Sequence, residues 1–333
     1  MKQFLLTLIA MMATTVSYAQ NNLVAVLSHD SEVQMFYGSS ALINAVDAAV
    51  SGDVITLSGG TFGCAKITKG ITIRGAGAET ENPTIISESN YENYTIDIPS
   101  EDNNRFVLEG VQINIRNSFK IINGNLNILK CIITGAKVIF DSSSTADAKF
   151  VNCSLSFDLS GSSKVKLSNC KLTGFTNASS TTSKAEFFNC YLADNNQSSY
   201  YKSSFVNCVL RSEIRYSVGS LAADVTAMNC VMINVGGGTK IDCYEATVPE
   251  FFASYYTTKD QYGTEFYWPT TDELSEEAKT TYLGTDGKEV GMFGGQHPYD
   301  LTPTYPLITK LNVAKQATAD NKLSVEIEVS ANE

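Results

Sequence analysis

The stretch Phe150-Val151-Asn152-Cys153-Ser154-Leu155 decides the fold, because its pattern recurs along the chain. The pattern is an apolar residue, a spacer, Asn-Cys, a spacer and a second apolar residue. Consecutive cysteines of the set lie 22, 17, 20, 18 and 22 residues apart. Self-similarity at about 20 residues predicts a solenoid in which each copy is one coil. The other copies are Leu167-x-Asn169-Cys170-x-Leu172, Phe187-x-Asn189-Cys190-x-Leu192, Phe205-x-Asn207-Cys208-x-Leu210, the weaker Ala227-x-Asn229-Cys230-x-Met232, and Ile128-x-Lys130-Cys131-x-Ile133, which lacks the Asn.

Each copy reads as two short strands that meet at the Asn. Small or apolar, polar and apolar residues alternate before it, which is the period of a strand with one buried face. Phe150 and Cys153 both look interior, so the strand must bend and reset its phase at Asn152. Asn tolerates the left-handed backbone region that such a turn needs, and stacked asparagines can hydrogen-bond from coil to coil. A β-sandwich with coincidental spacing is the alternative, and five Asn-Cys repeats argue against it.

This repeat resembles the right-handed parallel β-helix proteins of the pectin-lyase-like superfamily, over residues 38–235. The resemblance includes an amphipathic helical stretch at residues 41–50, the strand Val54–Leu57 and a further coil at residues 60–77. It implies an all-β fold with an N-terminal capping helix. The glycine-rich residues 284–295 resemble the closing turn of exported β-helix proteins of Bacteroidota.

The chain divides into four segments by composition. Residues 1–19 are expected to be a secretory signal peptide, with Lys2, an apolar run and small residues before Gln20. Residues 20–235 form the β-helix with its N-terminal cap, residues 236–300 an irregular C-terminal cap, and residues 301–333 a two-strand tail. We therefore expect an exported protein, periplasmic, cell-surface or extracellular, without a lipoprotein anchor or transmembrane segment.

The repeated cysteines admit two interpretations. Eight cysteines in an exported chain ordinarily suggest disulfides. Coils about 4.8 Å apart allow such bridges, yet in-register side chains point the same way rather than at each other. We favour a buried ladder of free thiols over isolated bridges, and expect neither a metal site nor a cofactor. The ladder residues are Cys131, Cys153, Cys170, Cys190, Cys208 and Cys230, beside Asn152, Asn169, Asn189, Asn207 and Asn229.

Charge limits the partners. The formal net charge is −11, and charged residues make up only 18% of the chain. An acidic surface disfavours nucleic acid and polyanionic polysaccharides unless a basic groove is hidden. Serine, threonine and asparagine are expected to cover the exposed strand faces.

The C-terminal third leaves alternatives open. Residues 239–300 are rich in aromatic residues and predict either a cap over the apolar end of the solenoid or a sugar-stacking surface. Residues 311–313 and 323–329 alternate as two strands that could pack on the helix or present an edge to a partner. Packing is favoured by an outward apolar strip just before the asparagines, at Leu129, Val151, Phe188, Val206 and Met228.

The sequence shows no strong catalytic constellation. Hydrolases with this fold carry close aspartates with a nearby His and Lys, and the coils contain no such set; an esterase set cannot be assembled either. A polysaccharide lyase needs acidic calcium ligands and an Arg or Lys base. The weak candidate is Arg211-x-Glu213-x-Arg215 on one exposed face, with Asp158 as a distant companion. A solvated strand face with favourable charge pairs is the simpler interpretation.

Two functions follow as expectations. The first is a non-catalytic exported module that binds a polysaccharide or another cell-surface protein. The second is a divergent polysaccharide lyase or other carbohydrate-active enzyme, which would use calcium. Fold alone does not decide between them.

Overall fold

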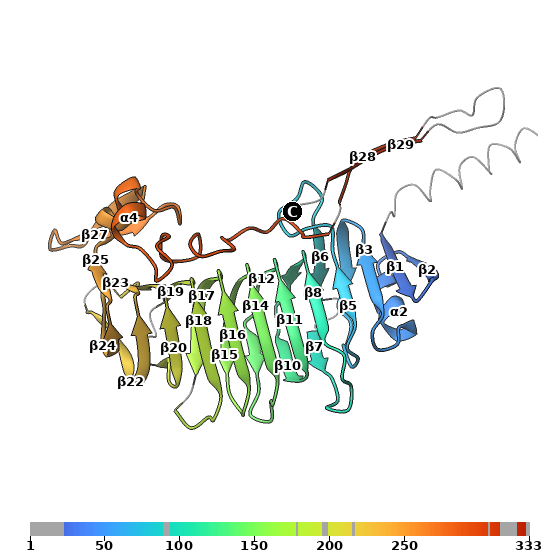
Figure 1. Ribbon diagram of the computed structural model, residues 1–333, viewed down its shortest axis with the longest axis horizontal. Helices are drawn as coiled ribbons and strands as arrows, with labels where there is room; N and C mark the ends of the chain where they lie inside the picture. Colours follow the sequence, from blue (N-terminus) through green and yellow to red (C-terminus); the bar gives the residue numbers. More distant parts are fainter. Residues whose placement is uncertain are drawn as a thin grey trace, which may run out of the picture.

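The chain forms a parallel β-solenoid of about 9 turns, as the repeat predicts (Figure 1). The computed structural model describes residues 23–88, 94–177, 179–194, 199–214 and 217–305, together with the backbone of residues 307–313 and 325–330. The expected signal peptide and Arg215 lie outside the described residues. Among the described helices, none has the length and apolar character needed to cross a membrane.

Two long sheets form the walls of the solenoid. The 12-stranded sheet has the order β2 (Glu32–Tyr37), β1 (Val24–His29), β3 (Val54–Leu57), β5 (Thr72–Arg74), β8 (Phe106–Glu109), β11 (Asn125–Leu129), β14 (Asp147–Val151), β16 (Lys164–Ser168), β18 (Lys184–Phe188), β20 (Ser203–Val206), β22 (Gly219–Met228) and β24 (Val235–Ile241). The 13-stranded sheet has the order β25 (Tyr244–Ala246), β23 (Val231–Ile233), β21 (Val209–Ser212), β19 (Tyr191–Asp194), β17 (Lys171–Asn177), β15 (Ser154–Leu159), β12 (Ile132–Thr134), β9 (Gln112–Asn114), β6 (Thr84–Ser87) and β4 (Gly60–Gly63), with β7 (Tyr94–Asp97), β10 (Phe119–Asn123) and β13 (Val138–Phe140) beside this path. Each coil contributes one strand to the 12-stranded sheet, and one or two to the 13-stranded sheet. Strands of consecutive coils pair in parallel register.

The Asn turns have the predicted left-handed backbone. The φ angle is +53° at Asn152 and between +49° and +54° at the other four asparagines of the ladder. Lys130 adopts φ +53° and Gly110 adopts φ +67° at the equivalent turns. The one-residue turn resets the side-chain phase, and both Phe150 and Cys153 are fully buried as expected.

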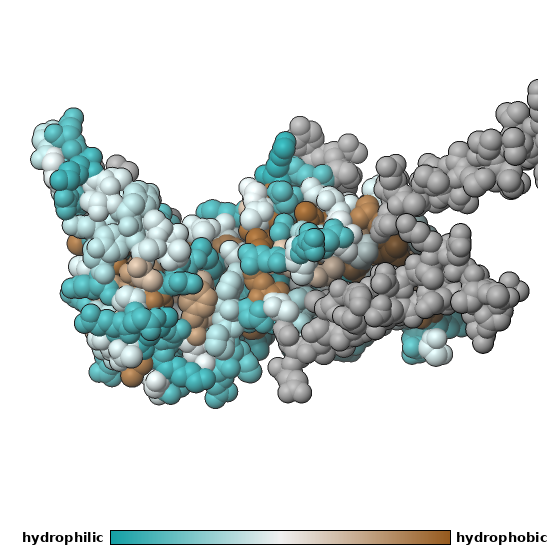
Figure 2. Space-filling model, turned by 90° about the horizontal axis from the view of Figure 1, so that it is seen from above, coloured by the Kyte–Doolittle hydropathy of each residue, from teal (hydrophilic) through white to brown (hydrophobic). Residues whose placement is uncertain are grey.

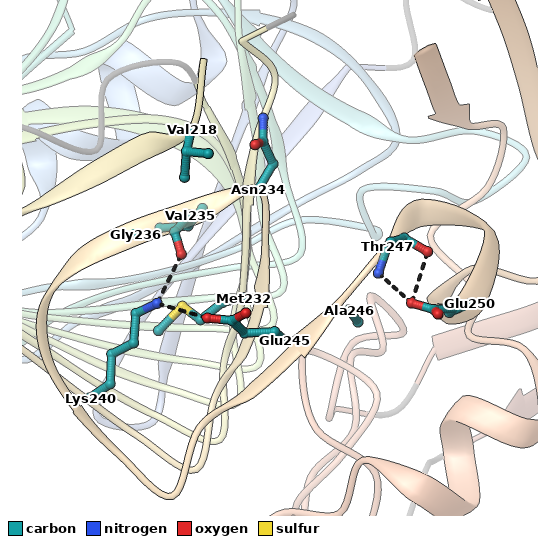
Figure 3. Close-up of a pocket in the computed structure, with 10 residues that line it drawn as sticks. All are labelled: Val218, Met232, Asn234, Val235, Gly236, Lys240, Glu245, Ala246, Thr247 and Glu250. Atoms are coloured by element: carbon teal, nitrogen blue, oxygen red, sulfur yellow. Dashed lines mark hydrogen bonds and ion pairs between the residues drawn. The ribbon is translucent and has the colours of Figure 1, made fainter. Parts of the chain in front are cut away.

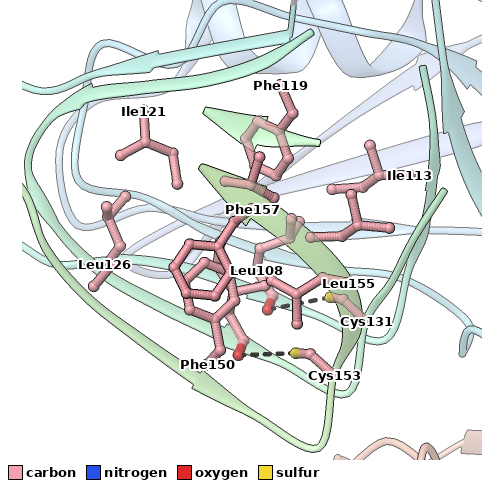
Figure 4. Packing of buried hydrophobic residues seen from close by; sticks show 14 of the residues in the cluster. Leu108, Ile113, Phe119, Ile121, Leu126, Cys131, Phe150, Cys153, Leu155 and Phe157 are labelled. Carbon is pink, nitrogen blue, oxygen red and sulfur yellow. Dashed lines mark hydrogen bonds between the residues drawn. The ribbon is translucent and has the colours of Figure 1, made fainter. Parts of the chain in front are cut away.

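The interior is a stack of aromatic rings beside a line of thiols (Figure 4). The ring centroids of Phe187 and Phe205 lie 4.5 Å apart with nearly parallel planes, and those of Phe157 and Phe175 lie 4.6 Å apart. All eight cysteines are free thiols, as we favoured. The Sγ atom of Cys153 donates to the carbonyl of Ile128 at 3.3 Å. Burial raises the pKa of the Cys153 thiol well above its usual value, which keeps it protonated.

The N-terminal end carries a helix and an unpredicted hairpin. Helix α2 (Ala41–Ala48) agrees with the expected helical stretch and buries Ala41, Leu42, Ala45 and Val46. Strands β1 and β2 pair antiparallel, and β1 also pairs antiparallel with β3. The 12-stranded sheet therefore ends in β2, which is the outermost strand of this end (Figure 1).

The solenoid continues beyond residue 235, where the expected periodicity stops. Strands β24 and β25 add one more coil, and Asp242 takes the place of the Asn at φ +50° before Cys243. In this coil Lys240 pairs with Ala227, so a lysine occupies the position that holds an apolar residue in the earlier coils. The repeat was missed because Asp replaces Asn and Lys replaces the apolar residue.

The C-terminal cap differs from the expected cover over the end of the solenoid. It contains α3 (Val248–Phe251), the antiparallel hairpin β26 (Tyr255–Lys259) and β27 (Glu265–Pro269), and α4 (Glu276–Thr281). Its apolar residues, including Phe251, Phe252 and Met292, pack on Tyr191 and Val209, the outward-facing residues of β19 and β21. The cap therefore covers the side of the last coils (Figure 1).

Residues 283–305, which we call the strap, run back along the solenoid over the Asn turns (Figure 1). Four of the five ladder asparagines hold this segment through Nδ2 donors. We expected them to bond from coil to coil, but in the described residues only one bond of that kind joins two of the asparagines, from Asn229 Nδ2 to Asn207 Oδ1 at 3.4 Å. The strap contacts are Asn229 Nδ2 to Leu283 O at 2.8 Å, Asn207 Nδ2 to Thr285 Oγ1 at 3.1 Å, Asn169 Nδ2 to Met292 O at 2.9 Å and to Gly294 O at 2.7 Å, and Asn152 Nδ2 to Pro298 O at 3.3 Å.

Polar contacts continue this line toward the N-terminal coils. Lys130 Nζ lies 3.0 Å from Asp300 Oδ2, at the turn that lacks the Asn. Thr304 N donates to Glu109 Oε1 at 2.9 Å. At Gly295 a Cβ atom would lie 2.1 Å from Asn189 Nδ2, so glycine permits the close approach.

The strap partly covers the predicted apolar strip. Leu129 and Val151 line a cavity of about 590 Å³ together with Pro298 of the strap, whereas Phe188 and Met228 each stay 38% exposed. Seen from the strap side, apolar patches alternate with polar surface (Figure 2). The predicted tail strands are present as the antiparallel pair β28 (Leu307–Val313) and β29 (Val325–Ser330). The cover over the strip is thus the segment that precedes the tail strands.

Candidate functional site

Arg211 and Glu213 lie on the outer side of the 13-stranded sheet, where β21 meets the C-terminal cap. They share a face as predicted, and Arg211 Nη2 contacts Glu213 Oε1. The prediction that Arg211 is exposed is wrong, because its residue surface is only 6% exposed. The cap buries it: Tyr191, which the cap residue Phe252 contacts, accepts a hydrogen bond from Arg211 Nε at 2.9 Å.

The guanidinium of Arg211 is a cation that Tyr191 and Glu213 hold in one position. Burial raises the pKa of Tyr191 to about 12, so its hydroxyl is protonated at neutral pH and can accept from the guanidinium. A guanidinium group is a permanent cation in proteins. A guanidinium that is held by two partners can orient the polar groups of a ligand. To act as a general base, it would first have to lose a proton. Arg211 is therefore suited to binding rather than to proton abstraction.

The aromatic hairpin forms the opposite wall. Its register places Tyr256 opposite Trp268 and Thr257 opposite Tyr267. Trp268 Nε1 donates to Thr258 Oγ1 at 3.0 Å, which fixes the indole. Tyr267 donates from its hydroxyl to Glu265 Oε2 at 2.8 Å and is 37% exposed. The hairpin thus carries partly exposed rings that are held by polar contacts.

A cavity of about 430 Å³ separates these two walls. Arg211 and Glu213 line one side, and Glu265, Tyr267 and Trp268 line the other. The structure therefore brings together two features that the sequence presented separately, the Arg-x-Glu pair and the aromatic run. No local pattern could join them, since more than 50 residues separate Glu213 from Tyr267.

A second cavity of about 430 Å³ lies at the axial end of the solenoid (Figure 3). Lys240 lines one side of it and donates from Nζ to the carbonyl of Val235 at 3.0 Å, with Glu245 Oε1 at 3.6 Å from the same Nζ. Asn234, Ala246 and Thr247 line both cavities. We call the two adjoining cavities the end groove.

A short helix fixes the floor of the end groove. Thr247 and Glu250 form a capping box at the start of α3, in which Thr247 N donates to Glu250 Oε2 at 2.8 Å. Figure 3 shows this pair across the cavity from Lys240. Sequence reasoning missed Lys240, Glu245 and Asn234. The Asp242-Cys243 pair was the signal that could have extended the repeat to them.

The remaining predicted site residues lie elsewhere. Asp158 pairs with Lys137 at 2.9 Å and does not line the end groove. Arg215 is outside the described residues. Within the part of the chain that the structure describes, no cluster of His, Cys, Asp and Glu side chains could hold a metal ion.

The end groove can offer stacking faces, fixed hydrogen-bond donors and carboxylate acceptors to a polar ligand. Comparisons with protein-family models, with curated proteins and with solved structures found no match for this chain.

Proposed function

We propose that this protein is an exported, non-catalytic β-helix module that binds a neutral glycan in the end groove. We also propose that it is a divergent member of the pectin-lyase-like superfamily, similar to exported β-helix proteins of Bacteroidota. The observation that carries the binding proposal is the cavity between the Arg211–Glu213 pair and the rings of Tyr267 and Trp268. Sugar rings present apolar faces for stacking and hydroxyl groups for hydrogen bonding, and this cavity offers partners for both.

Charge favours a neutral ligand over a uronate polymer. Four glutamates line the end groove, Glu213, Glu245, Glu250 and Glu265, against the cations Arg211 and Lys240. Both cations are already paired with carboxylates. A polyanionic chain would meet net repulsion there, which agrees with the formal charge of −11.

The lyase alternative gains no support from Arg211. Its guanidinium is buried and donates to Tyr191 and Glu213, so it cannot serve as a free base. A lyase would have to use residues other than this pair.

Binding to a panel of neutral and uronate polysaccharides tests the proposal, with and without calcium. Unsaturated products and reducing ends are followed in the same samples. We expect retention on a neutral glycan without product formation. Tyr267→Ala should weaken this binding about 10-fold, which corresponds to ~1.4 kcal/mol. Tyr262→Ala is the matched control, because Tyr262 is 83% exposed on the hairpin loop and does not line the end groove.

Two outcomes would contradict the proposal. Calcium-dependent unsaturated product would make the protein a lyase. Equal loss of glycan binding in the Tyr262 and Tyr267 variants would place the binding surface on the hairpin tip rather than in the end groove.

A further inference from the structure

The N-terminal edge of the 12-stranded sheet is open in the described residues. Strand β2 ends the sheet, and its only described partner is β1. Every second residue of β2 is apolar and exposed: Val33 is 60%, Met35 is 55% and Tyr37 is 65% exposed. Unpaired edge strands with apolar side chains are pairing templates, which proteins ordinarily shield.

The backbone of β2 is aligned to accept another strand. Gly38 N donates to Leu23 O at 3.0 Å, which makes Leu23 and Gly38 a hydrogen-bonded pair of the β1–β2 ladder. Hydrogen-bonded and non-hydrogen-bonded pairs alternate along an antiparallel ladder. Val33, Met35 and Tyr37 therefore fall in the non-hydrogen-bonded positions, opposite Ser28, Val26 and Val24. Their own N–H and C=O groups point away from β1, toward the open edge.

The apolar pattern of β2 is complementary to itself. When two copies of β2 run antiparallel about a two-fold axis at Met35, Met35 faces Met35 of the other copy and Val33 faces Tyr37. Facing residues in such a pair share one side of the sheet, so every exposed apolar side chain of β2 meets another.

Charge agrees with this register. Glu32 of one copy would face Gly38 of the other, so no like charges oppose each other along the strand. The outward backbone groups of Val33, Met35 and Tyr37 would pair with those of Tyr37, Met35 and Val33 across the axis.

We propose that the β2 edge joins two copies of this chain in a closed two-fold dimer, with the two 12-stranded sheets continuous across it. The interface is isologous, and the same residues contribute from each protomer. The dimer places the two end grooves at opposite ends, since each lies at the C-terminal end of its solenoid and β2 lies at the N-terminal end. It would thus present two distant ligand sites on one rigid body.

Analytical ultracentrifugation of the mature protein from about 1 µM to about 100 µM tests the proposal. We expect a reversible monomer–dimer equilibrium that stops at the dimer. Met35→Lys should shift it at least about 10-fold toward monomer, because two lysines would meet at the axis. Val50→Lys is the matched control, since Val50 is 51% exposed but lies outside β2, and it should leave the equilibrium unchanged.

A cross-link identifies the register. Cα atoms of a hydrogen-bonded antiparallel pair lie about 5.5 Å apart, and their Cβ atoms are farther apart than a disulfide prefers, so a short bifunctional maleimide is the suitable reagent. Met35→Cys should give a covalent dimer with this reagent, and Val50→Cys should not. A protein that stays monomeric at the highest concentration would overturn the proposal. Open-ended oligomers, or a dimer that Met35→Lys does not affect and Met35→Cys does not cross-link, would overturn it as well.

Discussion

The Asn ladder should hold the strap, and Asn169 provides the sharpest test. Its side chain is 4% exposed, and Nδ2 donates to the carbonyls of Met292 and Gly294 at 2.9 and 2.7 Å. Asn169→Gly removes both bonds while keeping a residue that adopts φ +51° without strain. Each bond contributes a net ~0.5–1.5 kcal/mol, so strap docking should weaken by about 1–3 kcal/mol.

Amide hydrogen exchange read by mass spectrometry measures this loss where it occurs. If the strap exchanges by local opening, its protection should fall about 5- to 150-fold in Asn169→Gly. Peptides from the buried coil strands should keep their protection. Asn169→Ala should show the same change in the strap and lose a further ~1–2 kcal/mol of global stability, because alanine is strained in the left-handed region.

Asn189→Gly is the matched control. Asn189 occupies the same turn position at φ +49°, and its side chain makes no hydrogen bond to the strap within the described residues. Strap exchange should therefore change little in this variant. Equal exchange in the Asn169→Gly, Asn189→Gly and unaltered proteins would refute the reasoning, since the asparagines would then serve only the turns.

Three further predictions concern the core, the thiols and the N-terminal end. Phe187→Ala should lower the free energy of unfolding, measured in urea, by about 3–5 kcal/mol. Phe188 is 38% exposed, so Phe188→Ala should lower it by less than about 1 kcal/mol. Similar losses in the two variants would contradict the assignment of Phe187 to the interior and Phe188 to the outer face. Dithionitrobenzoate should modify the half-buried Cys243 first and all eight thiols only after unfolding, and fewer than eight would reveal a disulfide. The hydrogen bond to Asp53 raises the pKa of His29 above 6.5, so its stabilisation should be full below pH 6.5 and disappear as the pH rises through the folded-state pKa. Urea midpoints from about pH 5 to about pH 9 should show this loss in the unaltered protein and not in His29→Gln.

The coil could be predicted because its rules are local. The turn at Asn152 needs a residue that tolerates positive φ, and the interior position at Phe150 needs an apolar side chain in every coil. Both requirements recur at nearly constant spacing, so they appear as a repeat in one sequence. Where a coil breaks the pattern, at Lys240 and Asp242, the same reasoning stopped one coil early.

The end groove could not be predicted because its walls come from distant segments. The sequence predicted that Arg211 is exposed, but it is buried. Alternation along β21 shows on which face of the sheet a side chain lies, but it does not show what covers that face. The cover is the cap, whose Phe251 and Phe252 pack on the outer side of the sheet. That placement depends on long-range apolar contacts, for which the chain carries no periodic signal.

The sequence by itself determined the parallel β-solenoid, the left-handed turns and the line of buried cysteines, because hydrogen bonds and side-chain phase repeat from each coil to the next. Only the tertiary structure decided that the asparagines bind the strap, that Arg211 is buried beneath the cap, and that β2 is the open edge of the sheet. These features arise where irregular segments meet the solenoid. Their positions depend on which surfaces pack together in the folded protein. Those contacts join distant segments, so they leave no local pattern in the sequence.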